Sequence, residues 1–259
     1  MMSNVLDPFV IMAYRQLKRF LRTKARVVTS ILNPIIWIAF FGLGWANAFN
    51  FPMAKAIFGG VDYLTFLTPG VTAMAVFTAS FIGGVTVIWD KQFGFLKEVL
   101  VAPASRTGII LGRIFGDAVT AVLQGLAIMV LSFAIASNLN PYGVLPALAY
   151  AFILALGFTS AGVALALKMT SMEGFQMVMS LLMMPLVFLS GAFYPIKFMP
   201  DWMRWVAYIN PLTYAVDGMR HYLSGVSTFN PLTDLVVLCA ITAAFMVLAS
   251  QLFKKATID

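Results

Sequence analysis

The chain has 259 residues, of which 61% are hydrophobic and only 10% are charged. A soluble domain carries about 25% charged residues, so this chain lacks the polar side chains that would cover a water-soluble globule. The net charge of +7 therefore indicates cations gathered on the cytoplasmic side of a membrane rather than a nucleic-acid surface. The single cysteine, Cys239, lies inside an apolar run, so it predicts neither an intramolecular disulfide nor a metal cluster.

Residues 8–25 are predicted to form an amphipathic helix. Asp7 and Pro8 supply an N-cap residue and a proline at the first helical position. One side of the helical wheel carries Arg15, Lys18, Arg19 and Arg22. The other side is apolar and consists of Phe9, Val10, Ala13, Leu17, Phe20 and Leu21. We expect an elbow helix in the membrane interface, with its cations facing anionic headgroups.

Six apolar runs of roughly spanning length, about 20 residues each, follow this helix. They cover residues 28–48, 64–88, 112–137, 142–168, 174–194 and 232–253. Most lysines and arginines lie before the first run, between the second and third, and after the last, which predicts that both termini are cytoplasmic. The first run continues to full spanning length, so no cleavable signal peptide is expected. The predicted fold is all-α, with residues 1–259 forming a single transmembrane domain.

Small residues and a proline mark two of these runs. Gly112 and Gly116 form a small-xxx-small pair that predicts close helix packing. Pro185 lies inside the fifth run and predicts a kink.

The cytoplasmic loop 89–107 carries a short amphipathic pattern. Phe93, Leu96 and Leu100 recur at the spacing of one helix face, Gly94 loosens the start of the helix and Pro103 stops it. Two interpretations stand at this point. The segment either rests on the lipid surface or docks on a second protein.

Residues 195–225, between the last two runs, predict two short helices on the extracytoplasmic side. Pro200 and the Asn210-Pro211 pair are each typical of a helix start. Both helices are too short to span a bilayer, so they are either interfacial or re-entrant. The aromatic residues Trp202, Trp205, Tyr208 and Tyr214 suit the headgroup level.

The motifs of common catalytic sites are missing from the sequence. There is no G-x-x-x-x-G-K-[ST] loop for ATP, no H-E-x-x-H, no cysteine pair and no G-x-S-x-G. His221 is the only histidine, so an enzyme is not expected. A secondary transporter would carry ionisable groups at the midplane. Asp117, which could pair with Arg113, and Asp234, at the mouth of the last run, do not make a proton relay by themselves.

Two segments resemble the membrane subunit of type-2 ABC transporters, a family that includes daunorubicin-resistance-type drug exporters and polysaccharide or lipid exporters. Residues 94–106, GFLKEVLVAPASR, resemble the pattern G-T-L-E-x-L-L-x-T-P-x-S-R. Residues 190–220 resemble the signatures S-G-x-x-x-P, P-x-W and N-P-L-x-Y-x-x-D-x-x-R. Phe95 and Lys97 replace the threonine and glutamate of the first pattern, and Glu98 stands where a basic residue is frequent.

The resemblance implies a permease in the plasma membrane of a prokaryote that exports a hydrophobic or amphipathic drug, lipid or glycan. Its loop helix would be a coupling helix that docks on a separate ABC ATPase subunit, and ATP and Mg would bind that partner, not this chain. The implied docking residues are Gly94, Phe95, Leu96, Lys97, Glu98, Leu100, Pro103 and Arg106. The implied outer-helix residues are Trp202, Trp205, Asn210, Pro211, Tyr214, Asp217 and Arg220.

The resemblance also implies a second permease copy, most simply in a homodimer, with substrate passing between the copies. Candidate residues along that path are Phe77, Phe81, Met184, Phe188 and Phe193. The alternatives are an ATPase-independent secondary transporter and a non-transporting membrane scaffold.

Overall fold

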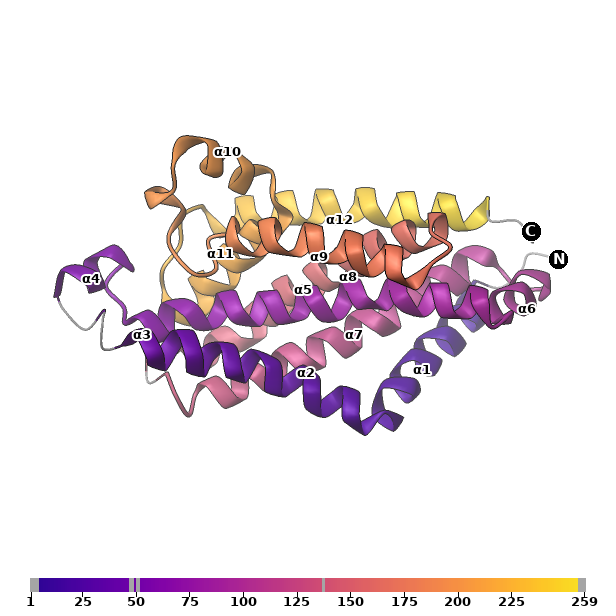
Figure 1. Cartoon of the computed structure of the whole chain (residues 1–259), viewed down its shortest axis with the longest axis horizontal. Coiled ribbons are helices and arrows are strands. Elements are labelled where there is room, and N and C mark those ends of the chain that lie inside the picture. The colour runs from indigo at the N-terminus through magenta and orange to yellow at the C-terminus, as the bar shows by residue number, and fades with distance from the viewer. Residues whose placement is uncertain (1–4, 47–48, 50–51, 137, 256–259) are drawn as a thin grey trace.

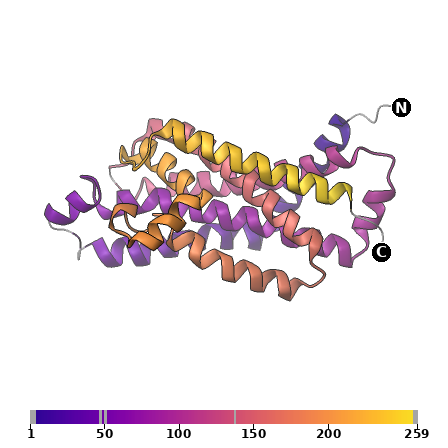
Figure 2. The same cartoon turned by 90° about the horizontal axis from the view of Figure 1, so that it is seen from above.

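The computed structural model describes residues 5–46, 49, 52–136 and 138–255, and within these ranges it contains helices and no strand. The elements are α1 Leu6–Arg22, α2 Lys24–Trp37, η1 Ile38–Leu43 (a π-helix), α3 Gly44–Ala46, α4 Pro52–Ile57, α5 Tyr63–Gln92, α6 Phe95–Val101, α7 Arg106–Ser132, η2 Pro141–Gly143, α8 Val144–Lys168, α9 Met172–Phe188, η3 Ile196–Phe198, α10 Asp201–Ile209, α11 Pro211–Ser224 and α12 Pro231–Lys254. The long helices run roughly along one axis, with α6 at one end and α10 and α11 at the other (Figures 1 and 2).

Four segments are long and apolar enough to cross a membrane: α5, α7, Pro141–Lys168 and α12. A fifth is possible if α1 and α2, which are bent by 90° relative to each other, are counted as one span. Helix α9 is apolar but has only 17 residues. The all-α, multi-pass character is confirmed, whereas the six-span topology stays a prediction.

Helix α9 ends at Phe188, earlier than the expected boundary at residue 194. The chain turns just beyond it, at Gly191, whose φ of +77° is a conformation that glycine adopts readily and other residues avoid. Pro185 lies in the last turn of the helix, and its carbonyl accepts a hydrogen bond from the N–H of Leu189. The predicted apolar run therefore contained a helix and the turn that follows it.

Helix α5 is the most buried long helix, with 83% of its most apolar window inside the molecule. Asp62 caps it by accepting hydrogen bonds from the backbone N–H and the hydroxyl of Thr65, at 3.0 and 2.7 Å, and from Nδ2 of Asn138 at 2.9 Å. Burial acts to raise the pKa of Asp62, but the hydrogen bonds from Asn138 and Thr65 outweigh it and hold the pKa below its ordinary value.

Helix α1 packs lengthwise against α7, an arrangement that the helical wheel did not predict. Gly108, Gly112 and Gly116 present a bare backbone to α1, and a Cβ at Gly112 would lie 2.2 Å from the carbonyl oxygen of Phe9. This confirms the close packing predicted for the glycine pair. Val10 and Leu21, which the wheel placed with the apolar side, are exposed, while the buried residues include Met12, Gln16 and Phe20.

Candidate functional site

The predicted coupling segment forms helix α6, and Gly94 separates it from α5. Gly94 adopts a φ of +79°, so the chain changes direction there and Phe93 lies outside the helix. Phe93 is 83% exposed, whereas Leu96 is 7% exposed and packs into the core. The expectation that these two side chains share one helix face is therefore wrong. Leu100 lies within α6, but its side chain is outside the described part of the structure.

Of the remaining docking candidates, Phe95 and Arg106 contact other helices, whereas Lys97 and Glu98 are exposed. The guanidinium of Arg15 lies 4.0 Å from the ring centroid of Phe95, which fastens α6 to α1. Lys97 and Glu98 are exposed. Arg106 donates a hydrogen bond of 2.9 Å to the carbonyl of Lys254, at the end of α12. Helix α6 thus exposes Lys97 and Glu98 while it contacts α1 and α5, and Phe93 is exposed at the end of α5 just before it.

Pro103 lines a hollow of about 410 Å³ between α1 and the α6–α7 connection. Helix α6 ends at Val101, and Ala102 is already extended, as expected for a residue that precedes a proline. The predicted stop at Pro103 is confirmed.

A buried polar network behind α6 joins α1, α5 and α7. Asp90 accepts hydrogen bonds from Nη1 of Arg113 at 2.6 Å and from Nη2 of Arg15 at 3.4 Å, and Arg113 also donates to the hydroxyl of Thr86. Nε2 of Gln16 donates to Asp117 at 2.9 Å. Asp117, one helical turn away, was a possible partner of Arg113 by sequence spacing. The ion pair that Arg113 makes is with Asp90 on the neighbouring helix.

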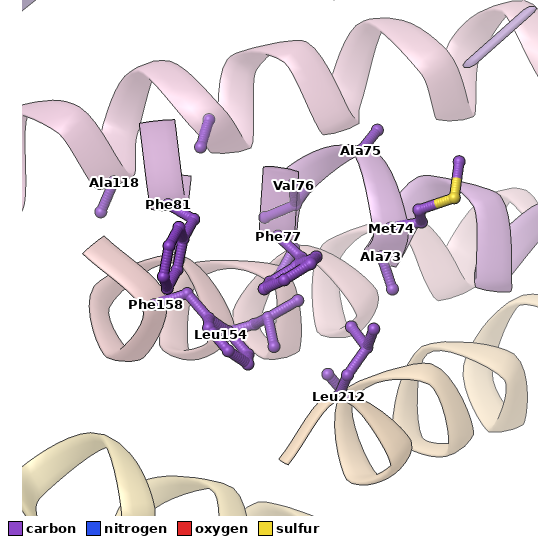
Figure 3. Packing of buried hydrophobic residues seen from close by; sticks show 14 of the residues in the cluster. Ala73, Met74, Ala75, Val76, Phe77, Phe81, Ala118, Leu154, Phe158 and Leu212 are labelled. Carbon is purple, nitrogen blue, oxygen red and sulfur yellow. The ribbon is translucent and has the colours of Figure 1, made fainter. Parts of the chain in front are cut away.

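The candidate path residues are not gathered in one place. Phe77 and Phe81 are buried and pack against Phe158 inside the bundle, with a Phe77–Phe158 centroid distance of 4.5 Å (Figure 3). Phe193 is also buried and stacks on Phe188 at 5.2 Å. Met184 is 68% exposed on α9. In a single chain, Phe77 and Phe81 are core residues.

A cavity of about 390 Å³ lies between α2 and α5. Its polar lining comes from hydroxyl and amide side chains, and no charged side chain is among its described lining residues. The lining residues are Thr29, Ser30, Asn33, Pro34, Trp37, Met74, Ala75, Thr78, Ala79, Ile82, Gln124 and Met183. Thr29 and Asn33, one helical turn apart in an otherwise apolar run, were the signal that could have revealed it.

The motif at residues 210–220 lies at the opposite end of the bundle and joins α11 to neighbouring helices. We call this motif the staple. The two short helices expected there are present as α10 and α11. Asn210 caps α11 by accepting from the N–H of Leu212, and its Nδ2 donates to the carbonyl of Leu186 at 2.7 Å. Pro211 occupies the first helical turn, as predicted. Tyr214 donates its hydroxyl proton to the carbonyl of Tyr208.

Arg220 completes this staple from inside the molecule. It donates to the carbonyls of Phe66, Gly191 and Ala192 at 2.9 to 3.2 Å, and its guanidinium lies 3.8 Å from the ring centroid of Phe66. Asp217 accepts backbone N–H bonds from the segment after α11. Trp202 and Trp205, in contrast, are exposed on α10. The N-P-L-x-Y-x-x-D-x-x-R signature therefore fixes α11 to α5, to α9 and to the turn after α9.

The described residues contain no group of three or more histidine, cysteine, aspartate or glutamate side chains that could hold a metal ion.

Comparison with known proteins identifies the family of this chain. Residues 8–223 match the model of the family described as ABC-2 type transporter. The transport permease ycf38 of Cyanophora paradoxa is 31% identical over 210 residues, which are 79% of this chain and 71% of that protein.

Two bacterial relatives match over a greater length. The inner membrane transport permease YadH of Escherichia coli (strain K12) is 24% identical over 245 residues, covering 93% of this chain and 92% of that protein. Nodulation protein J of Rhizobium leguminosarum bv. viciae is 25% identical over 233 residues, covering 89% and 87%. The motifs at both ends of the bundle, the apolar helices and the family match lead to one conclusion: the chain is a multi-pass membrane protein that belongs to the ABC-2 type transporter family.

Proposed function

We propose that this chain is the membrane subunit of an ATP-driven exporter and that α6 docks on a separate ATPase subunit, which binds ATP and Mg. The observation that carries the proposal is the geometry of the α6 end. Phe93 is exposed just before α6, and Lys97 and Glu98 are exposed on α6, which Phe95 and Leu96 hold against the bundle. An exposed aromatic anchor offers buried area to a partner, and flanking charges set register. Because α6 is held against the bundle, a displacement of α6 by the ATPase would be transmitted to the neighbouring helices.

The proposed orientation puts the α6 end and both termini in the cytoplasm of a prokaryotic cell, where the basic residues of α1 belong. The proposed assembly contains a second copy of the chain. Exposed apolar side chains lie on α2 and η1 (Ile36 and Phe40) and on α9 (Leu181 and Met184), and a second copy would cover them. The cavity between α2 and α5 is apolar with hydroxyl and amide groups and suits an uncharged part of a hydrophobic or amphipathic substrate.

A pair of matched aspartate substitutions tests the docking. Phe93→Asp changes an exposed aromatic residue at the α6 end, and Tyr142→Asp changes a 91% exposed aromatic residue at the other end of the bundle. A separate ABC ATPase subunit serves as the partner in the test, and the measurements are co-purification and ATP hydrolysis in nanodiscs. We expect Phe93→Asp to weaken ATPase binding by about 30-fold, the loss of an interface hot spot, and Tyr142→Asp to leave binding unchanged.

Equal behaviour of the two variants would contradict the docking role of α6. Substrate transport in liposomes that contain this chain alone, driven by a proton gradient, would instead support an ATPase-independent transporter.

A further inference from the structure

Asp234, on the first turns of α12, is buried without a conventional partner. The residue is 0% exposed, and neither of its carboxyl oxygens has a hydrogen-bond partner among the described residues. A buried ionised carboxylate without donors is strongly disfavoured. The charge state of this side chain therefore needs an explanation.

Asp217 on α11, which is also a carboxyl group, interacts electrostatically with Asp234. Hydrogen-bond donors surround Asp217. It accepts hydrogen bonds from the backbone N–H of Thr228, at 2.9 Å to both oxygens, and of Phe229 at 2.8 Å. The buried guanidinium of Arg220 adds a favourable electrostatic interaction with Asp217. Two carboxyl groups can share a hydrogen bond only if one of them is protonated.

Two tyrosines around Asp234 donate their hydroxyl protons to backbone carbonyls and not to Asp234. Tyr150 on α8 donates its hydroxyl proton to the carbonyl of Pro231, and Tyr214 on α11 donates to Tyr208. Cys239 on α12 and Tyr222 on α11 act electrostatically on Tyr150. Helix α7 contacts α12 at the other end of the bundle, where Arg106 binds the carbonyl of Lys254. These partners leave Asp217 as the group that Asp234 can bind.

We propose that Asp217 and Asp234 form a proton-binding site in which Asp234 holds the proton and donates it to the carboxylate of Asp217. The bound proton joins α12 to α11 and to the segment Thr228–Phe229. Loss of the proton puts two negative charges in contact in a buried place, so the outer end of α12 separates from α11. Because α11 is also fixed to α5 through Arg220, the protonation state outside the membrane acts on the helix that crosses it.

The test uses the full chain in nanodiscs, with infrared detection of the carbonyl stretch of a protonated carboxylic acid at neutral pH. We expect wild type to show this band and Asp234→Asn to lack it. Asp201→Asn, which changes an exposed aspartate on α10, serves as the matched control and retains the band. If Asp234→Asn does not fold, wild-type protein labelled with ¹³C at aspartate carboxyl groups still decides the matter, because absence of the band overturns the proposal.

The pH dependence of unfolding gives a second readout. One extra proton bound by the folded state makes stability fall as pH rises, by up to about tenfold in the folding equilibrium per pH unit. We expect the melting temperature of wild type and Asp201→Asn to fall as pH rises above the ordinary carboxyl pKa of about 4, and Asp234→Asn to lose this decrease. An identical pH dependence in Asp234→Asn overturns the proposal. So does calcium that stabilises wild type but not Asp234→Asn at high pH, because the pair would then hold a metal ion.

Discussion

Asp90 is the residue whose removal is expected to do most damage to the α6 end. Its carboxylate pairs with Arg113 at 2.6 Å, and the two side chains are only 7% and 4% exposed. Replacement by asparagine keeps the shape but leaves the guanidinium of Arg113 buried without a counter-charge. Breaking a buried ion pair in this way costs about 3–5 kcal/mol. Arg15, 31% exposed at 3.4 Å, contributes much less because solvent screens it.

The assay is chemical unfolding of the purified chain in mixed micelles, followed by tryptophan fluorescence. We expect Asp90→Asn to lower the free energy of unfolding by about 3–5 kcal/mol. In the double variant Asp90→Asn/Arg113→Met, most of that loss should return, because the unpaired buried charge is gone. Arg204→Met, which removes an exposed pair with Asp201 at 3.6 Å, is the control and should change little.

A loss in Asp90→Asn no larger than in Arg204→Met would refute the reasoning. So would a double variant that is less stable than Asp90→Asn alone. Either result would mean that the network does not hold α1, α5 and α7 together.

Three further outcomes follow from local geometry. Gly112→Leu should detach α1 from α7 and lower thermal stability by several degrees, because a Cβ already meets the backbone of α1 at 2.2 Å, while Gly44→Ala, with nothing within 4 Å, should be neutral. Because the pKa of Asp62 is lowered by its partners, its stabilising effect is present above the ordinary carboxyl range and is lost as pH falls. Asp62→Asn should therefore unfold more easily at neutral pH and show a weaker acid dependence, and Asn138→Ala should reproduce part of both effects in pH-dependent melting. Trp205 should be quenched by brominated lipid labelled near the headgroups, and quenching by an aqueous reagent alone would contradict an interfacial α10.

The apolar runs and the helix starts could be predicted because they depend on local chemistry. Helix α12 lies within one residue of the predicted run 232–253 at each end. Helix α11 starts after the capping residue Asn210, and α10 starts directly after Pro200. The end of α9 was missed because Gly191 adopts a positive φ inside a stretch that still reads as apolar. Periodicity reports side-chain polarity, and it does not report where the backbone turns.

The sequence motifs located the candidate site. The contacts between its helices could not be predicted from the sequence. A helical wheel treats α1 as a lone helix facing lipid, so it could not reveal that the glycines of α7 admit the α1 backbone. Arg113 has an acidic residue one turn away in its own helix, yet its ion pair is with Asp90, 23 positions earlier in the sequence. Such long-range pairs depend on how helices dock, which one sequence does not encode in local patterns.

Helix α5 connects the two ends that the motifs occupy. Near its C-terminus, Asp90 is bound by Arg113 and Arg15, and Arg15 also stacks on Phe95 of α6. Near its N-terminus, the carbonyl of Phe66 accepts from Arg220 on α11. At 1.5 Å per residue the two points lie about 36 Å apart along one continuous helix. A displacement of α6 would therefore reach the α11 end of the bundle through noncovalent contacts at the two ends of α5, made by Arg15 of α1 and by Arg220 of α11.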